Sequence, residues 1–190
     1  MLERIESERL VIRGWRPEDA APLKDAIDSS LGELRLWVPW AMDEPSSVQI
    51  LATRLAAMRE RFVAGDDWAY GVFEADESKV IGGAGLHPRG STEHLEIGYW
   101  IRTGARGRGF ATEAAAALCG AAFAHTSVER LEIHCDVENA RSARVARCLG
   151  FERGRELRQE TVTPRGSHRN TVVWTLNRSA LGSVPNRRWA

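Results

Sequence analysis

Residues 95–112 have the sequence LEIGYWIRTGARGRGFAT, in which an apolar strand pattern leads into a glycine-rich turn and the start of a helix. The last part of this segment is Arg106-Gly107-Arg108-Gly109-Phe110-Ala111-Thr112. Glycine lets a backbone come close to a ligand, and the first N–H groups of a helix point outward at the positive end of the helix dipole. The segment therefore predicts a binding site for an anion.

Three other interpretations of this loop can be weighed from its residues. A dinucleotide-binding fingerprint requires Gly-x-Gly-x-x-Gly, but Gly107-x-Gly109 is followed by Thr112. A Walker phosphate loop requires Gly-Lys-Ser or Gly-Lys-Thr, and the segment has neither. A strained turn without a ligand is the third alternative, and the residues alone leave it open.

Arginine is concentrated in the loop and in one later segment, at Arg106, Arg108, Arg141, Arg144 and Arg147. The guanidinium group binds phosphate in a two-pronged geometry, so the cluster supports a local anion site. The chain has only two lysines, Lys24 and Lys79, and a general bias toward arginine is the alternative explanation.

The rest of the chain alternates between strand and helix patterns. Helices are predicted over 17–27, 48–64, 111–125 and 140–149, and a capping-box pattern at Ser46 and Gln49 precedes the second of them. Strands are predicted over 9–15, 68–74, 80–86, 95–101, 131–137, 155–162 and 169–176. These elements predict a mixed α/β (α+β) fold. No shift in composition marks a linker, so we expect one domain over 1–178 and a flexible tail over 179–190.

Composition excludes several classes of protein. The 190 residues include 26 basic and 26 acidic ones, and this balance argues against a dedicated nucleic-acid-binding protein. No apolar run approaches the roughly 18–20 residues of a membrane span, and the charged first residues do not resemble a secretory signal, so we expect a cytoplasmic protein without a membrane partner. Cys119, Cys135 and Cys148 fit neither a disulfide framework nor a zinc site.

A resemblance to a known family emerges from the motifs taken together. Arg106-x-x-Gly109-x-Ala111 resembles the pyrophosphate-binding loop of the GNAT superfamily of N-acetyltransferases. The segments 7–13, 18–19, 37–40 and 96–101, together with Asn139-x-x-Ser142-x-x-Val145-x-x-x-Leu149-Gly150-Phe151, are similar to the RimJ/RimL branch, which acetylates ribosomal proteins at their N-termini. The resemblance extends over about residues 7–176.

The resemblance implies a twisted mixed sheet of about seven strands, with a V-shaped splay between the central parallel strands 96–101 and 131–137. It implies that the pantetheine of acetyl-CoA lies in this splay and is held by the backbone around Tyr99, Trp100 and Ile101, where N–H groups also hold the thioester oxygen. Asn139 would bind the pantetheine, although it equally fits a cap for the helix over 140–149. The residues implied to bind the diphosphate are Arg106, Gly107, Arg108, Gly109, Ala111 and Thr112.

Catalytic assistance to the leaving sulfur is implied at Ser142, which resembles the serine that donates a hydrogen bond to it in this branch. A solvent-facing position on the helix is the alternative for Ser142. Many members of the superfamily carry a tyrosine acid four residues later, but this chain has Ala146 there. The branch also often shows an Arg-Asp pair in its last strand, where this chain has Arg169-Asn170.

The general base is open between Glu96 and Glu160. Glu96 resembles the glutamate base of some superfamily members, and Glu160 lies in a later strand that we place near the cleft. Each of them also fits a structural role, and His87 and Tyr70 remain further candidates.

The predicted reaction is transfer of acetyl from acetyl-CoA to a primary amine, in particular the N-terminal α-amine of a protein or peptide. We expect the acceptor to enter past Trp37, Trp40 and the hairpin over 68–86, with Tyr70 among its contacts. No metal is implied, and Cys135 is either a reactive thiol or a packed one. Three alternatives stay open: a small-molecule acceptor such as an antibiotic, polyamine or amino acid, a larger acyl group, and a sensor that binds acyl-CoA without turnover. A homodimer is also left open.

Overall fold

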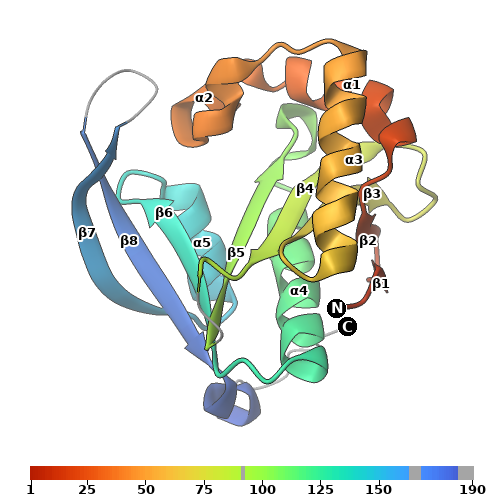
Figure 1. The fold of residues 1–190 in the computed structure, drawn as a ribbon. Helices are drawn as coiled ribbons and strands as arrows, with labels where there is room; N and C mark the ends of the chain where they lie inside the picture. Colours follow the sequence, from red (N-terminus) through yellow and green to blue (C-terminus); the bar gives the residue numbers. More distant parts are fainter. Residues whose placement is uncertain (91–92, 163–167, 184–190) are drawn as a thin grey trace.

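The computed structural model describes residues 1–90, 93–162 and 168–183. In this part of the chain one sheet has the strand order β1-β2-β3-β4-β5-β6-β8-β7 (Figure 1). Neighbouring strands are antiparallel, except that β5 and β6 are parallel. The strands are β1 (Arg4–Glu6), β2 (Leu10–Gly14), β3 (Trp68–Glu74), β4 (Val80–His87), β5 (His94–Ile101), β6 (Arg130–Asp136), β7 (Glu152–Val162) and β8 (His168–Asn177).

The sheet opens at its centre. In the described residues β5 pairs with β6 only over His94–Glu96 and Arg130–Glu132, and beyond these residues the two strands diverge into a V (Figure 1). The expected mixed sheet with a splay between its two parallel central strands is therefore confirmed. The sheet has eight strands rather than seven because the three-residue β1 adds an edge, and so short a strand has no alternating pattern to detect.

The helices are α1 (Ala20–Asp28), α2 (Leu31–Trp37), α3 (Val48–Ala64), α4 (Phe110–His125) and α5 (Ala140–Cys148). Short 3-10 helices are η1 (Pro17–Asp19), η2 (Pro39–Asp43), η3 (Thr103–Ala105) and η4 (Arg178–Ser183). The sequence pattern did not predict α2, which has a single buried apolar residue, Leu34, and therefore little periodicity. The cap of α3 is Ser47, one residue after the expected Ser46, and its hydroxyl accepts from the N–H of Ile50.

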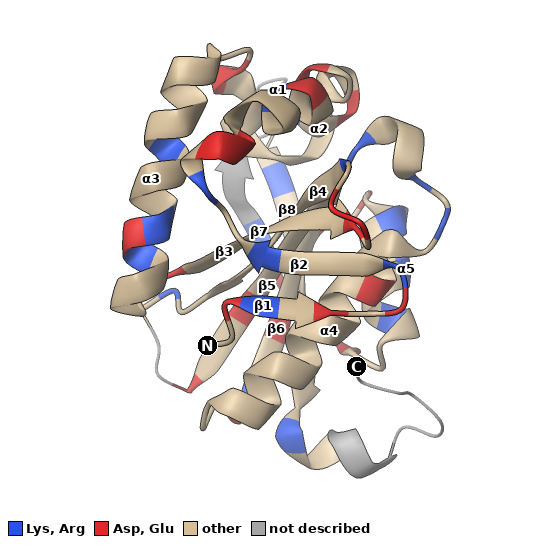
Figure 2. Cartoon of the chain, turned by 90° about the vertical axis from the view of Figure 1, so that its right-hand side faces the viewer, with Lys and Arg blue, Asp and Glu red and all other residues tan. Residues whose placement is uncertain are grey.

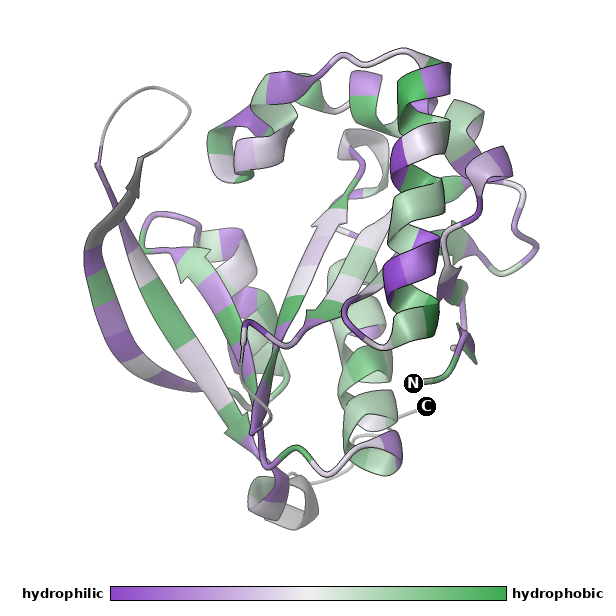
Figure 3. Ribbon diagram, viewed as in Figure 1, coloured by the Kyte–Doolittle hydropathy of each residue, from purple (hydrophilic) through white to green (hydrophobic). Residues whose placement is uncertain are grey.

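The helices cover both faces of the sheet. α4 packs on one face together with α5, and α1 and α3 pack on the other (Figure 1). α4 is apolar around most of its circumference (Figure 3), as expected for a helix that is enclosed on several sides. Charged residues lie on the surrounding helices and loops. On α3, basic and acidic residues lie next to one another (Figure 2).

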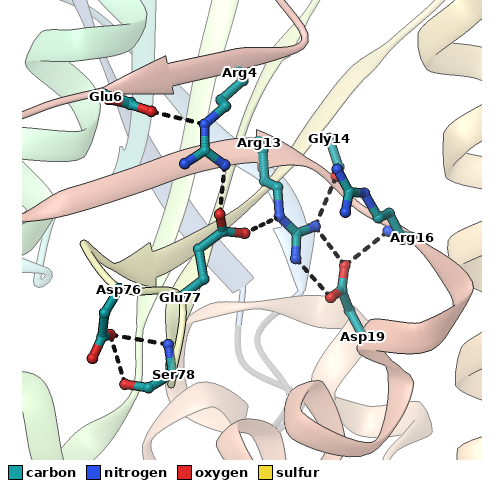
Figure 4. Close-up of polar contacts among 9 residues, drawn as sticks. All are labelled: Arg4, Glu6, Arg13, Gly14, Arg16, Asp19, Asp76, Glu77 and Ser78. Atoms are coloured by element: carbon teal, nitrogen blue, oxygen red, sulfur yellow. Dashed lines mark hydrogen bonds and ion pairs between the residues drawn. The ribbon is translucent and has the colours of Figure 1, made fainter.

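A buried ion-pair network joins β2 to η1 and to the turn between β3 and β4 (Figure 4). The guanidinium of Arg13, which is 8% exposed, donates to both carboxylate oxygens of Asp19 at 2.8 and 2.9 Å. Its Nε donates to Glu77 at 2.6 Å. The Asp19 carboxylate also accepts from the backbone N–H of Arg16 at 2.9 Å. The network thus fixes the start of the helical layer against the sheet.

We expect Asp19→Ala to lower the free energy of unfolding by about 3 kcal/mol, because it leaves a buried guanidinium with only part of its charge compensated. Urea unfolding at neutral pH measures the change. The matched control is Asp28→Ala, which removes an exposed pair with Lys24 at 2.7 Å and should cost less than about 1 kcal/mol. Equal losses in the two variants would contradict a stabilising role for the network.

The division into a domain over 1–178 and a tail over 179–190 stays a prediction. η4 occupies the first residues of the expected tail, and residues 184–190 lie outside the described part. Arg178 donates to the carbonyls of Phe123, Thr126 and Val128, which anchors the start of η4 to the end of α4. Within the described residues, every helix is too short or too polar to cross a bilayer.

Candidate active site

The loop before α4 has the geometry that an anion site requires. Gly107 and Gly109 have φ angles of +73° and +84°, a backbone conformation that glycine adopts without strain. Gly109 is the N-cap of α4, and the first N–H groups of a helix have no partner within it. The predicted turn followed by a helix is therefore confirmed, whereas binding of a diphosphate by Ala111, Thr112 and the loop stays a prediction.

Two arginines from distant segments converge beside this loop on one carboxylate. Glu33 of α2 lies 2.6 Å from Nη1 of Arg106 and 3.3 Å from Nη1 of Arg141 at the start of α5. The hydrogen bond from Arg106, together with the positive charges of both arginines, lowers the pKa of Glu33. A carboxylate oxygen thus occupies a position suited to a phosphate oxygen. Arg108 instead packs with its guanidinium 4.6 Å from the centre of the Phe110 ring.

The open end of the splay is crossed by α2 (Figure 1). Besides the ion pairs of Glu33, the end of α2 is held by Arg169 of β8, which donates to the carbonyls of Trp37 at 2.8 Å and Leu36 at 3.1 Å. Arg169 also lies 2.8 Å from the carboxylate of Asp136 at the end of β6. The acid that pairs with Arg169 therefore comes from a neighbouring strand. Position 170, where the branch often has Asp, is Asn170 in this chain.

Ser142 and Tyr99 face each other across the splay. The Tyr99 hydroxyl on β5 lies 2.9 Å from Oγ of Ser142 on α5. Burial raises the pKa of Tyr99, so the phenol keeps its proton and can donate to Ser142, whose own proton is then available to a ligand. Asn139 caps α5 by accepting from the N–H of Ser142 at 3.1 Å, which is the alternative role that the sequence left open. Its predicted contact with pantetheine is untested.

Trp100 and Ile101 complete the predicted pantetheine strand, and their backbone pairs with β4 at Gly83 and Gly82. The Trp100 side chain packs away from Ser142, against the ring of Trp40 in η2 at 5.9 Å between centroids. Trp40 is 38% exposed, and contact of Trp37 and Trp40 with an acceptor stays a prediction. Cys135 is buried, which raises the pKa of its thiol, and a packed thiol is the interpretation that fits.

A cavity of about 420 Å³ lies on the sheet face opposite Ser142, where β5 and β6 begin to diverge. Its walls are formed by Arg89, His94, Glu96, Glu132, His134, Arg155 and Leu157. Glu96, a predicted base, faces this cavity, but its carboxylate is paired with Nε of Arg89 at 2.8 Å. The sequence analysis did not single out His134 or Glu132, although their alternation with Ile133 and Cys135 places both on the same face of β6.

The other predicted acceptor and base residues lie elsewhere. Tyr70 is fully buried, its hydroxyl donates to the carbonyl of Leu2 at 2.9 Å, and its ring packs on Phe62, so it can neither contact an acceptor nor act as a base. Assigning Tyr70 to the acceptor site is wrong because this strand position points into the core. The imidazole of His87 is bonded to Asp67 at 2.5 Å. Glu160 lies in β7, and its side chain is outside the described part of the structure.

Metal ligation has no candidate in the described residues, where no group of three or more His, Cys, Asp and Glu side chains is arranged to hold an ion. The ionisable groups of the cavity instead pair with one another, as Glu96 does with Arg89. The site therefore offers hydrogen bonds and proton transfer from side chains.

Comparison with known proteins gives the family. Residues 9–152 match the acetyltransferase (GNAT) domain. The chain is 30% identical over 156 residues to the ribosomal protein uS5-alanine N-acetyltransferase of Escherichia coli strain K12, a match that covers 79% of this chain and 78% of that protein.

Solved structures show the same fold at lower identity. RimL, a ribosomal L7/L12 alpha-N-protein acetyltransferase in complex with coenzyme A, has a TM-score of 0.83 at 19% identity, covering 92% of this chain and 98% of that one. A ribosomal-protein-S5-alanine acetyltransferase from Vibrio fischeri has a TM-score of 0.81 at 19% identity, covering 92% and 96%. With the domain match over most of its length, the chain belongs to the GNAT family of acetyltransferases.

Proposed function

We propose that this chain transfers the acetyl group of acetyl-CoA to the N-terminal α-amine of a protein. The observation that carries the proposal is the splay between β5 and β6, which connects the anion loop and Ser142 on one face of the sheet with the ionisable cavity on the other. A thioester held in the splay has a hydrogen-bond donor for its sulfur on one side and a site for an amine on the other. The named activity of the Escherichia coli relative supports a protein acceptor.

The anion loop fits the diphosphate of the donor. Its N–H groups and the guanidinium groups of Arg106 and Arg141 supply donors of the kind that phosphate oxygens accept. Phosphate binding there requires that the Glu33 carboxylate give up its position between the two arginines. In the proposed complex, the divergent edges of β5 and β6 bind the two amides of pantetheine, and N–H groups near Tyr99 hold the thioester oxygen.

Ser142 acts on the leaving sulfur. Because a thiolate with an ordinary pKa of about 8.5 is already a tolerable leaving group, a hydrogen bond from the serine hydroxyl is sufficient help. Tyr99 orients that hydroxyl by donating to its oxygen. In this arrangement Ser142 stabilises negative charge as it develops on sulfur and does not need to be a strong acid.

An α-amine acceptor is expected to react faster than a lysine side chain. At pH 7 an α-amine with a pKa of about 7.7–8.0 is roughly a tenth deprotonated, whereas a lysine amine near 10.4 is free in about one molecule in 2,500. We therefore expect a peptide with a free N-terminal alanine and no lysine to be acetylated at least about tenfold faster than an N-blocked peptide with one lysine. Thiol release with the two peptides measures the ratio.

The same assay includes the alternatives as outcomes. Preference for the lysine peptide would contradict the proposal of an α-amine acceptor. Activity on a polyamine or an aminoglycoside but on neither peptide would assign the enzyme to small molecules. Binding of acetyl-CoA without turnover of any amine would favour a sensor.

A further inference from the structure

We propose that His134 is the general base that takes a proton from the acceptor ammonium, with Glu132 as the residue that positions it. The inference deepens the proposed function and rests on it. Successive side chains of β6 point to opposite faces of the sheet. Cys135 faces the α5 side with Ser142, and His134 faces the cavity. The backbone of β6 therefore lies between the proposed site of the sulfur, on the Cys135 face, and the proposed site of the amine, on the His134 face.

Glu132 determines which nitrogen of His134 carries the proton. Nε2 of His134 lies 2.8 Å from Oε2 of Glu132, a side chain that is only 2% exposed. Burial alone would raise the pKa of Glu132, but the hydrogen bond with His134 and the surrounding basic groups outweigh burial and lower it. Glu132 is therefore a carboxylate and an acceptor only, so Nε2 of His134 must be the donor. The lone pair of the neutral imidazole is then on Nδ1.

Nδ1 of His134 faces the place where an amine can enter. It lies 4.0 Å from Oε2 of Glu96, which is too far for a direct hydrogen bond. An ammonium group between these two atoms can contact the Glu96 carboxylate and give a proton to Nδ1. Glu96 itself is less suited to accept this proton because both of its oxygens face the guanidinium of Arg89, at 2.8 and 3.5 Å.

Charged groups of both signs surround the cavity that His134 lines. β5 contributes His94 and Glu96, the segment before β5 contributes Arg89, β6 contributes Glu132 and Arg130, β7 contributes Arg155, and the neighbour on β8 is the apolar Val173. The two carboxylates nearest to the ring favour the imidazolium, while the arginines favour the neutral ring. Imidazole is the side-chain base whose ordinary pKa lies closest to neutral pH, and this chemistry suits it to the proposed role.

In the proposed step, His134 begins as a neutral imidazole and the acceptor as an ammonium ion. R–NH₃⁺ gives one proton to Nδ1 and becomes R–NH₂, whose lone pair forms the C–N bond at the thioester carbon. The C–S bond breaks, and its electron pair leaves with the sulfur. The second proton lost by nitrogen ends on that sulfur, and the imidazolium returns its proton to solvent. The products are the acetylated amine, the CoA thiol and one proton.

The experiment compares pH profiles of kcat/KM for the alanine peptide in His134→Gln and in the matched control His125→Gln, which changes an exposed histidine at the end of α4, outside the cavity. Glutamine retains a donor for Glu132 but cannot act as a base. We expect His134→Gln to lose about tenfold in kcat/KM at pH 7, where roughly a tenth of the α-amine is free, to recover most of this deficit above pH 9, where the amine is deprotonated, and to bind acetyl-CoA with unchanged affinity. His125→Gln should keep the wild-type profile.

Glu132→Gln tests the positioning role, because loss of the carboxylate beside the ring should move the acid limb of the profile to lower pH. An NMR titration of the wild-type histidine rings provides a measurement that does not depend on folding of a variant. The proposal requires that the midpoint of the NMR titration of the His134 ring agree with the midpoint of the acid limb of kcat/KM.

An unchanged rate and acid limb in His134→Gln, or a His134 ring that titrates away from the limb, would overturn the assignment. If the wild-type protein acetylates a polyamine and not the peptide, the proposed acceptor is wrong and the same profiles with the polyamine decide the role of His134. A protein that acetylates neither amine overturns both proposals.

Discussion

A Gly109→Glu protein is expected to lose measurable binding of acetyl-CoA, with the dissociation constant raised at least about a hundredfold, or about 2.7 kcal/mol. Gly109 has a φ of +84° and caps the N-terminus of α4, where the proposed site of the diphosphate lies. A glutamate there adds a carboxylate beside a ligand of the same sign and strains the backbone. Isothermal titration calorimetry with acetyl-CoA gives the affinity.

The matched control is Gly90→Glu, which introduces the same side chain at a left-handed position with a φ of +74°, in the loop between β4 and β5. This variant carries the same charge and a similar backbone strain away from α4, so its affinity for acetyl-CoA should equal that of the wild type. Circular dichroism establishes that both variants are folded. Wild-type affinity in a folded Gly109→Glu protein would remove the main support for the donor site.

Ser142→Ala is expected to lower kcat and kcat/KM together by about ten- to a hundredfold and to leave the affinity for acetyl-CoA nearly intact. The reason is that the hydroxyl strengthens its bond to sulfur only as negative charge develops there. Steady-state kinetics with the alanine peptide measures both constants.

Tyr99→Phe is the companion variant for Ser142, because it retains the ring and removes only the hydroxyl that lies 2.9 Å from Oγ. It should reduce kcat less than Ser142→Ala does, since the serine proton remains. A rise in KM for acetyl-CoA with kcat unchanged in Ser142→Ala would instead make Ser142 a binding residue.

Local patterns were sufficient to predict most of the sheet and the anion loop. The strand, turn and helix of residues 95–112 are all present because their signals, apolar alternation and closely spaced glycines, lie within a few residues of one another. Short or weakly periodic elements were not predictable because they lack such local signals. β1 has three residues, and α2 is held by Glu33 and by the contacts of Arg169, which join segments more than 70 residues apart.

The parts of the site that depend on pairing between strands were beyond the sequence patterns. Alternation along β6 places Glu132 and His134 on one face. It does not show that Glu96 of β5 lies beside them, because their proximity depends on the register between two strands whose paired residues are 36 positions apart. The partner of Ser142 is Tyr99, which lies 43 residues away on another element. The resemblance to the family directed attention to position 146, in the same helix as Ser142. Tyr70 was assigned to the acceptor site because its strand forms a hairpin, but its ring packs on Phe62 of α3, a contact that the pattern of the strand does not reveal.

The short ladder between β5 and β6 also affects how the protein behaves without its donor. Beyond Glu96 and Glu132 the described parts of both strands turn unpaired edges toward the splay, in the middle of a sheet that is otherwise continuous. An open strand edge is a template for pairing with another chain, and proteins commonly protect such edges by covering them. α2 gives partial cover through its contacts with Arg106, Arg141 and Arg169. We expect a donor that binds in the splay as proposed to cover the remaining edges with its backbone-like amides, and so to lower the tendency of this protein to aggregate edge to edge.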